Sequence, residues 1–439
     1  MPVQEMTSTL LTGVTRVAAD TQFGIYGATL ATTITESRHQ NFARSSYTLA
    51  NSIIKVVTNT ITGGTTALTS RKNLAAGALS ATITAETTGF FEDTTNTDSL
   101  VAADEFDYQI AVGTGTSIIF SMVGCTLTEG ALTTFDRIQA AGSGGSGVGQ
   151  GTIAGTFQGY GGTSLGTSIP ESEAIWTFRF SATLSNMYGW IPTTGTSIAT
   201  LTTRINLAAG AQSATKAAAA TGAFEDAVNT DSAVAGDEGT FGIATDIESV
   251  RNIGVWEVKM VGAGSPQVCM ASAGNSVLGD NYAAPSGVFE ENTTESNAQM
   301  KARSAFTGQN LFVNVKLHGV TGGYNIKLRK NTADTSVTVS IGDSATGVFE
   351  DTTNTAGFVS ADLYNYLLDR VGSANTITMS CVAFTAVKTA GGGGGSGGGP
   401  GQGNPPPGRG RGGNPPPPPP APSARQRGWG QRMRGWSRH

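Results

Sequence analysis

The residues best suited to chemistry are carboxylates that recur in a motif of the type GFFEDTTNTDSLVAAD. The motif occurs three times and ends at Asp104, Asp237 and Asp362. Loop carboxylates and amides are the oxygen ligands that Ca²⁺ prefers. Calcium is therefore the one cofactor that the pattern leaves open, and its ligands in the first copy would be Glu92, Asp93, Asn96, Asp98 and Asp104. The third copy has Ala356 where the first has Asp98, so a site there would lack one ligand.

A structural role explains the same motif without a metal, and we favour it. We expect the phenylalanine of each copy to end a strand after a glycine and to anchor the core. The following Asp and Asn side chains can accept hydrogen bonds from backbone N–H groups downstream, in Asx turns that order a long loop. The residues assigned to this repeated framework are Phe91, Asp93, Asn73, Phe224, Asp226, Asn206, Phe349, Asp351 and Asn331.

Catalytic constellations are absent from the sequence. The three histidines, His39, His318 and His439, stand in unrelated places. One glutamate recurs per copy, at Glu36, Glu171 and Glu295, and a single carboxylate is not an acid/base pair. The cysteines Cys125, Cys269 and Cys381 lie far apart without metal-ligand spacing, so we interpret each as a small buried hydrophobe. The sequence therefore predicts a protein that is not an enzyme.

Two further motifs keep register with the carboxylate motif. Asn73, Asn206 and Asn331 each precede Asp93, Asp226 and Asp351 by 20 residues. The successive motifs are 133 and 125 residues apart, a period much longer than that of stacking solenoid repeats. Equal internal spacings with unequal gaps indicate one folded unit used three times.

The chain divides on this basis into three repeats, two linkers, an N-terminal extension and a tail. The predicted boundaries are an N-terminal extension over 1–20 that could act as a donor strand, repeat 1 over 21–130, a Gly-rich linker over 131–154, repeat 2 over 155–264, a linker over 265–277, repeat 3 over 278–388, and a Gly/Pro-rich basic tail over 389–439.

Composition and periodicity indicate the fold of the repeats. Only 13% of residues are charged, which is too few for coiled coils or helical solenoids, and the 60 glycines show no collagen period. Alternating segments such as VTVSIG and LFVNVKL are typical of half-buried strands, and turn clusters separate them. Ala-rich ATKAAAATG in repeat 2 permits a helix, but the shared register favours a strand. We predict an all-β chain of three tandem homologous antiparallel β-sandwich domains, Ig-like or jelly-roll.

The tail differs in composition from the repeats. Gly and Ser predict a flexible tether, the prolines of 415–420 predict a stiff polyproline rod, and the end is basic and aromatic. Residues 408–439 hold seven arginines and no acid, so the rest of the chain, with 20 basic and 32 acidic residues, is near −12. Three interpretations of the tail stay open: binding to RNA, DNA or an anionic surface, docking on the acidic body of a neighbouring copy, and a solvated tail. Opposite charges on tail and body favour docking. The residues assigned to this assembly role are Arg425, Arg427, Trp429, Arg432, Arg434 and Trp436.

No secretory signal is visible at the N-terminus and no apolar run is long enough to span a membrane. The repeat pattern and composition of residues 21–388 resemble tandem Ig-like or jelly-roll subunits of bacterial surface filaments, and also fibre or decoration proteins of phage virions. In pilus-type filaments this resemblance implies donor-strand exchange, in which an N-terminal strand completes the sandwich of another subunit.

The leading functional hypothesis is a self-assembling subunit of an extracellular helical filament or a virion appendage, with copies of itself as partner. An adhesin that binds glycans or a host surface through loop aromatics such as Tyr160 and Trp190 is the first alternative. A protein that binds nucleic acid through its Arg/Trp tail is the second, since interleaved Arg and Trp suit phosphate contact and base stacking.

Overall fold

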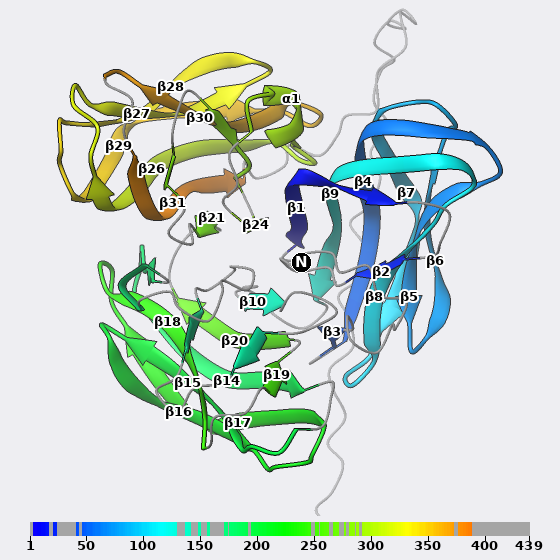
Figure 1. The fold of residues 1–439 in the computed structure, drawn as a ribbon, viewed down its shortest axis with the longest axis horizontal. Helices are drawn as coiled ribbons and strands as arrows, with labels where there is room; N and C mark the ends of the chain where they lie inside the picture. The colour runs from blue at the N-terminus through cyan, green and yellow to red at the C-terminus, as the bar shows by residue number, and fades with distance from the viewer. Residues whose placement is uncertain are drawn as a thin grey trace, which may run out of the picture. The chain divides into compact units, whose positions relative to one another are not determined.

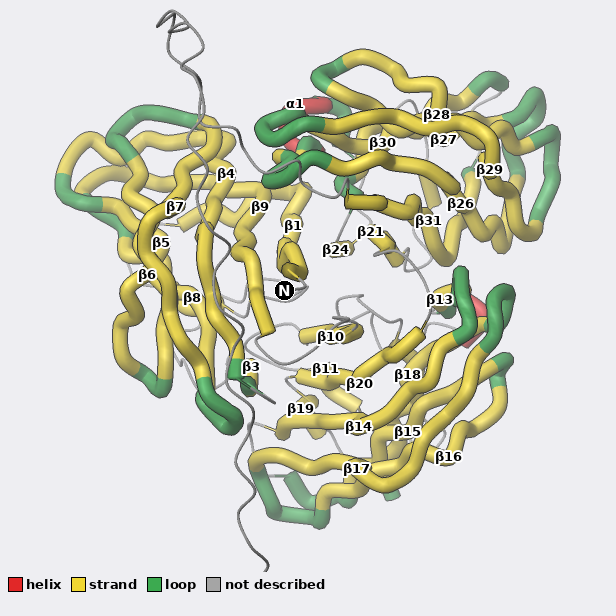
Figure 2. Tube along the Cα trace, turned by 180° about the vertical axis from the view of Figure 1, so that it is seen from behind, coloured by secondary structure: helices red, strands yellow, loops and turns green. Residues whose placement is uncertain are grey.

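Over the residues that it describes, the computed structural model is almost entirely β (Figure 1, Figure 2). The described residues are 3–16, 21–23, 41–43, 46–129, 137–141, 148–150, 156–158, 171–173, 175–191, 195–246, 251–253, 255–262, 267–271, 276–277, 281–285, 287–288, 292–372 and 376–388. Two short helical turns accompany the strands, a 3-10 turn η2 (Glu171–Glu173) and α1 (Glu295–Ala298). The tail from 389 onward, including all six residues given an assembly role, lies outside the described residues.

Repeat 1 contributes two antiparallel sheets. The first has the order β1-β9-β4-β7 and the second the order β2-β8-β5-β6, with β3 also pairing with β8. Their bounds are β1 (Val3–Arg16), β2 (Thr21–Phe23), β3 (Asn41–Phe42), β4 (Tyr47–Gly63), β5 (Thr66–Lys72), β6 (Ala75–Ile83), β7 (Gly89–Leu100), β8 (Glu105–Ala111) and β9 (Thr114–Glu129).

Repeat 2 shows the same pairing order. Its sheets are β10-β20-β14-β17 and β12-β18-β15-β16, with β13 on β18 and a separate β11-β19 pair. Their bounds are β10 (Arg137–Ala141), β11 (Val148–Gln150), β12 (Thr156–Gln158), β13 (Trp176–Thr177), β14 (Ala182–Ile191), β15 (Ala199–Ile205), β16 (Ala208–Lys216), β17 (Gly222–Ala233), β18 (Glu238–Thr245), β19 (Arg251–Ile253) and β20 (Val255–Gly262).

Repeat 3 repeats the scheme once more. Its sheets are β24-β21-β31-β26-β29 and β23-β30-β27-β28, with β22 on β31 and β25 on β30. Their bounds are β21 (Gln267–Ala271), β22 (Ser276–Val277), β23 (Asn281–Ala283), β24 (Gly287–Val288), β25 (Met300–Lys301), β26 (Phe306–His318), β27 (Tyr324–Lys330), β28 (Ala333–Ile341), β29 (Gly347–Phe358), β30 (Leu363–Arg370) and β31 (Ile377–Lys388). The all-β, sandwich-like character predicted from alternation is confirmed.

The segments predicted as linkers also contain strands. β10 and β11 lie within 131–154, and β21 and β22 lie within 265–277. β10 pairs with β20, and β21 pairs with β31, at the position that β1 takes beside β9 in repeat 1. Each repeat therefore receives an added strand from the chain that precedes it; β1 and β10 lie at a sheet edge, and β21 lies between β24 and β31. Backbone N–H and C=O groups of short apolar stretches such as RIQAA and QVCMA are satisfied there.

The Ala-rich stretch ATKAAAATG of repeat 2 was expected to be a strand, but apart from Gly222, which begins β17, only its first three residues, 214–216, are in one, because the four consecutive alanines at 217–220 lie in the turn before β17. Ala208–Lys216 is β16, and residues 217–221 form the turn that follows it. Alternation along β16 still buries Gln212 and Ala214, so its neighbours override the helical propensity of alanine. Cys125 and Cys381 are buried, as predicted, while the side chain of Cys269 lies outside the described residues.

Candidate functional site

The repeated asparagines form the two-residue turns between β5 and β6, β15 and β16, and β27 and β28. Asn73 and Leu74 both have positive φ, of 48° and 67°, which is the geometry of a type I′ hairpin turn. Asparagine tolerates this left-handed conformation better than most residues. The same pair of angles recurs at Asn206–Leu207 and Asn331–Thr332. The conserved spacing of these asparagines therefore has a local backbone cause.

The side chain of each turn asparagine also clamps the last aspartate of the carboxylate motif. Asn73 Nδ2 donates to Asp104 Oδ1 at 2.7 Å, and Asn73 Oδ1 accepts from the Glu105 N–H at 2.8 Å. Asn331 makes the same two bonds, to Asp362 at 2.7 Å and from Leu363 at 2.8 Å. The carboxylate in turn accepts from a backbone N–H three residues earlier, as Asp104 does from Val101 at 2.7 Å.

The first aspartate of the motif joins the two sheets of each repeat. Asp93 lies on β7, and its Oδ2 accepts from the N–H of Ser80 on β6, the edge strand of the other sheet, at 2.8 Å. Its Oδ1 accepts from the N–H groups of Thr95 and Asn96, at 3.1 and 3.0 Å. Asp226 and Asp351 make the equivalent bonds. Across the seam, which is the boundary between the two sheets of a repeat, they accept from the N–H groups of Ser213 and Thr338 at 2.9 Å each.

Hydrogen bonding keeps these carboxylates ionised. Burial alone raises the pKa of Asp93, but bonds from Ser80, Asn96 and Thr95 outweigh it and lower the pKa well below its ordinary value. The same balance, with donors Asn229, Ser213 and Val228, lowers the pKa of Asp226 to about 2.

The sequence prediction for this motif needs one correction. The motif does not follow the end of a strand in a long loop, because it lies inside β7, β17 and β29. The predicted Asx turn is present, but as a bulge: Ala50 pairs with Thr97 and Ser52 with Asp93, which leaves 94–96 opposite Asn51. The phenylalanines begin these strands. Phe224 is buried in the core of repeat 2, and Phe91 and Phe349 pack half-buried against their cores.

The second aspartate of the motif forms a polar set in two repeats. Asp98 accepts from the N–H groups of Ala78 and Leu79, at 2.7 and 3.2 Å, and from the hydroxyl of Ser70. Gly77 lies beside it, and a Cβ there would collide with the Asp98 carboxylate. Repeat 2 keeps the set as Thr203, Gly210 and Asp231. Repeat 3 replaces it by Leu328, Thr335 and Ala356, where the Thr335 hydroxyl donates to the Leu328 carbonyl at 2.6 Å.

This exchange predicts which substitutions repeat 1 tolerates. We expect Gly77→Thr alone to destabilise the chain by about 2 kcal/mol, because the added side chain meets Asp98 and Ser70. The triple variant S70L/G77T/D98A installs the set of repeat 3 and is expected to recover all but about 1 kcal/mol of the loss. Calorimetric unfolding of the two variants measures the difference. A triple variant as unstable as the sum of its single substitutions would contradict the interpretation.

The five calcium candidates of repeat 1 have separate partners. Asp93, Asp98 and Asp104 accept the backbone and side-chain hydrogen bonds described above. Asn96 Nδ2 donates to Asp93 at 2.9 Å. Glu92 forms an ion pair with Lys301 of repeat 3. Within the described ranges, no group of three or more His, Cys, Asp or Glu side chains is placed to hold a metal ion. These carboxylates are thus engaged in the seam, the turn clamp and a contact between repeats.

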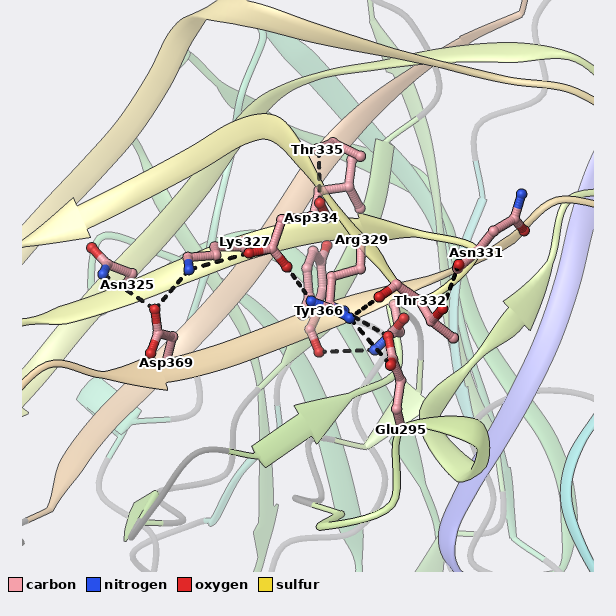
Figure 3. Close-up of polar contacts among 12 residues, drawn as sticks. Glu295, Asn325, Lys327, Arg329, Asn331, Thr332, Asp334, Thr335, Tyr366 and Asp369 are labelled. Carbon is pink, nitrogen blue, oxygen red and sulfur yellow. Dashed lines mark hydrogen bonds and ion pairs between the residues drawn. The ribbon is translucent and has the colours of Figure 1, made fainter.

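The recurring glutamate pairs with an arginine that the sequence analysis missed. Arg204 Nε and Nη2 bond Glu171 Oε1 and Oε2 at 2.5 and 3.0 Å. Arg329 bonds both oxygens of Glu295 at 2.6 and 3.3 Å (Figure 3). Both arginines also donate to the carbonyl of the turn residue three positions later. The signal was visible as an arginine two positions before each repeated asparagine, while Glu36 of repeat 1 lies outside the described residues.

Repeat 3 also carries a charged row on β27 and its neighbours. Lys327 lies between Asp334 and Asp369, at 3.3 and 2.8 Å, and Arg329 also pairs with Asp334 (Figure 3). The hydrogen bonds that Lys327 donates to Asp369 and Asp334 raise the pKa of Lys327. These pairs are partly exposed, with 42% of the Asp334 side chain accessible, so each contributes little to stability.

Repeat 3 contacts repeat 1 through buried and charged groups. Arg303 donates to the carbonyl of Asn51, at the bulge of β4, and Lys301 pairs with Glu92. Lys55 of repeat 1 is only 5% exposed and donates to the carbonyls of Ser296 and Gln299 at the end of α1, the second at 3.2 Å. A cation at the C-terminal carbonyls of a helical turn is the favourable arrangement.

Repeat 3 also contacts repeat 2. Arg179 pairs with Glu350 and stacks 4.2 Å above the ring of Phe312. Asn314 Nδ2 donates to Thr177 Oγ1 at 3.1 Å, and Lys316 pairs with Glu238 at 2.9 Å.

The buried ammonium of Lys55 makes the contact with repeat 3 dependent on pH. Burial lowers the pKa of Lys55 from 10.5 to about 8, so the unfolded chain holds this proton at pH values where the folded chain has lost it. Stability should therefore rise between pH 8 and 10.5, by up to about 3 kcal/mol. Thermal unfolding across this window should show the rise in the wild type and in Lys316→Met but not in Lys55→Met. Identical slopes in all three would contradict it.

Comparison with known proteins does not identify a family for this chain. No protein-family model matches the chain, and no curated protein matches it. In the part of the chain that the structure describes, no helix is long and apolar enough to cross a membrane. Of the two aromatics suggested for glycan binding, Tyr160 lies outside the described residues and Trp190 is half-buried on β14.

Proposed function

We propose that this chain is a non-enzymatic structural protein, a self-assembling subunit of an extracellular helical filament or a virion appendage. In this proposal its three repeats are tandem homologous β-sandwich domains of Ig-like or jelly-roll type. The observation that carries it is that the same surface positions join repeat 1 to repeat 3 and repeat 3 to repeat 2. A folding unit that binds copies of itself through complementary faces can form polymers.

The hydrogen bonds and ion pairs of the repeated polar residues support a structural role. The aspartates and asparagines of the motif accept or donate hydrogen bonds within the fold, at the seam and at the hairpin turns. Two of the recurring glutamates, Glu171 and Glu295, are paired with arginines. These side chains hold strands together.

The N-terminal strand is the segment that we propose to pass between subunits. β1 lies at the edge of its sheet and, among the strands that the structure describes, pairs with β9, in a register interrupted between Thr9 and Val14. An edge strand can leave one sheet and pair with the same position in a neighbour, since the hydrogen bonds formed are equivalent. The second attachment in this proposal is the basic tail, whose charge is opposite to that of the remaining chain.

Deletion variants test this assembly. Negative-stain microscopy of the purified chain is expected to show polymers, and removal of 1–20 is expected to abolish them or shorten them severely. Removal of 391–439 is expected to weaken assembly in a salt-dependent way. A matched control is a chain in which the tail arginines are replaced by lysine, which keeps the charge. Polymers that both deletions leave unchanged would contradict the mechanism.

A further inference from the structure

Repeats 1 and 3 connect their two sheets in the same way. The connections are residues 84–88 between β6 and β7, and residues 342–346 between β28 and β29. Each contains a residue with positive φ, Glu86 at 55° and Ser344 at 53°. The N–H of Glu86 donates to the Ile61 carbonyl at 3.0 Å. The N–H of Ser344 donates to the Val320 carbonyl at 3.4 Å. These bonds close the connections against the end of β4 and against the residues after β26.

An asparagine side chain secures the connection of repeat 1. Asn59 follows the bulge residue Asn51 by eight residues. Its Nδ2 donates to the carbonyls of Thr84 and Thr87, at 2.9 and 3.0 Å. Its Oδ1 accepts from the N–H of Ile61 at 3.0 Å. One amide thus supplies two donors and one acceptor at this end of the sandwich.

Repeat 3 has a histidine at the same position. His318 follows Asn310 by eight residues and is only 6% exposed. In the part of the chain that the structure describes, neither of its ring nitrogens reaches a hydrogen-bond partner. A neutral imidazole carries one N–H donor, where the amide of Asn59 offers two, so it cannot reproduce both bonds. The longer bond of Ser344 agrees with a connection that is held less tightly.

The surroundings of His318 disfavour a proton on its ring. Burial lowers the pKa of His318 below its usual value of 6.5. The negative charge of Asp343 and the nearby carbonyls of His318 and Val320 favour the proton, but they offset only part of the effect of burial on the pKa. The folded chain therefore holds this side chain neutral at pH 7.

Few charged groups surround the ring. Those of the adjacent elements are Lys316 on β26, Asp343 in the connection, and Asp369 and Arg370 at the end of β30. Residues 319–323 after β26 and 376–380 at the start of β31 carry none. Lys316 and Asp369 already pair with Glu238 and Lys327. Asp343 is exposed, so water screens the charge that it offers to an imidazolium.

We propose that His318 makes the connection 342–346 acid-sensitive, so that it is closed while the ring is neutral and opens when the ring takes up a proton. An imidazolium has two N–H groups and is costly to bury without acceptors for them. The Val320 carbonyl is one acceptor near the ring, and it is also the acceptor of the Ser344 N–H. A protonated ring therefore competes with Ser344 for the carbonyl that closes the connection.

The direction of the response follows from the lowered pKa of His318. As the pH falls below about 6.5, the unfolded or opened chain binds the proton before the closed one does. The closed connection is therefore favoured above this pH and loses its advantage below it. The carboxylates of the repeated motif titrate at lower pH and Lys55 at about 8, so histidine is the side chain that responds between pH 5 and pH 7.

The acid-sensitive connection lies next to a strand that contacts repeat 2. β29 begins directly after it, at Gly347, and carries Glu350, which pairs with Arg179. Opening the connection therefore loosens the start of this strand. This response goes beyond the proposed function and does not depend on it.

Amide hydrogen exchange of the full-length chain, measured by mass spectrometry and corrected for the intrinsic effect of pH, tests the response. The protection of residues 342–346 is expected to fall about tenfold between pH 7 and pH 5. Residues 84–88 of the same molecule are the internal control and should keep their protection. His318→Asn installs the residue of repeat 1 and should remove the dependence on pH. Asn59→His should transfer it to residues 84–88.

Two results would overturn the proposal. One is equal protection of residues 342–346 at both pH values in the wild type, and the other is a fall that persists in His318→Asn, which would assign the response to another group. If His318→Asn does not fold, Asn59→His decides, since protection of residues 84–88 that stays independent of pH in that variant would equally contradict the role of the histidine.

Discussion

The variant Asp351→Ala is expected to destabilise the chain by about 3 kcal/mol. The Asp351 carboxylate is 7% exposed and accepts from the N–H of Thr338 across the seam at 2.9 Å and from Thr353 and Asn354 at 3.2 and 3.0 Å. Alanine would leave these donors without their acceptor. It would also release β28 from β29, which are edge strands of different sheets.

Two further substitutions make this measurement specific. Asp351→Asn keeps one carbonyl oxygen and is expected to cost about half as much. Thr352→Ala, an exposed position on the same strand, should cost less than about 0.5 kcal/mol. Calorimetric unfolding of the three variants gives the order. If Asp351→Ala and Thr352→Ala were equally stable, the carboxylate would not hold the seam.

Acidification is expected to unfold the chain steeply between about pH 4 and pH 2. The folded chain lowers the pKa values of six repeated carboxylates: Asp93, Asp104, Asp226, Asp237, Asp351 and Asp362. Since the unfolded chain takes up these protons first, their contribution is present above the ordinary value of 3.8. It is lost as the pH falls toward about 2, the value for Asp226.

Circular dichroism during an acid titration measures this transition. Its steepness should correspond to the uptake of several protons, and Asp226→Asn should make it shallower by about one proton. Asp343→Asn, an exposed carboxylate, is the matched control and should leave the steepness unchanged. A chain with the same melting temperature at pH 2.5 and pH 7 would contradict the role assigned to the carboxylates.

Sequence alone was sufficient for the features that each repeat carries in the same form. The alternation in VTVSIG and the spacing from Asn73 to Asp93 predicted strands and a common register, because local backbone geometry sets both. The Asx turn at Asp93 was also predictable, since it depends on donors within three residues.

Features that depend on distant neighbours were not predictable in this way. The N–H of Ser80 reaches Asp93 only after the two sheets pack. The sequence therefore predicted a loop for the motif, and the structure has a strand with a bulge. The contacts between repeats could not be predicted from the sequence either, because Lys55 and Asn314 occupy equivalent positions with different chemistry. Segments predicted as linkers form strands because the backbone groups along β20 and β31 would otherwise stay unpaired on that side and can bond a nearby part of the chain.

The measurement that most directly tests the central proposal is negative-stain microscopy of the intact purified chain, with light scattering across a dilution series. We expect the intact chain to form regular polymers of uniform width that shorten on dilution. A single species with the mass of one chain at every concentration would contradict it, whatever the stability of the repeats.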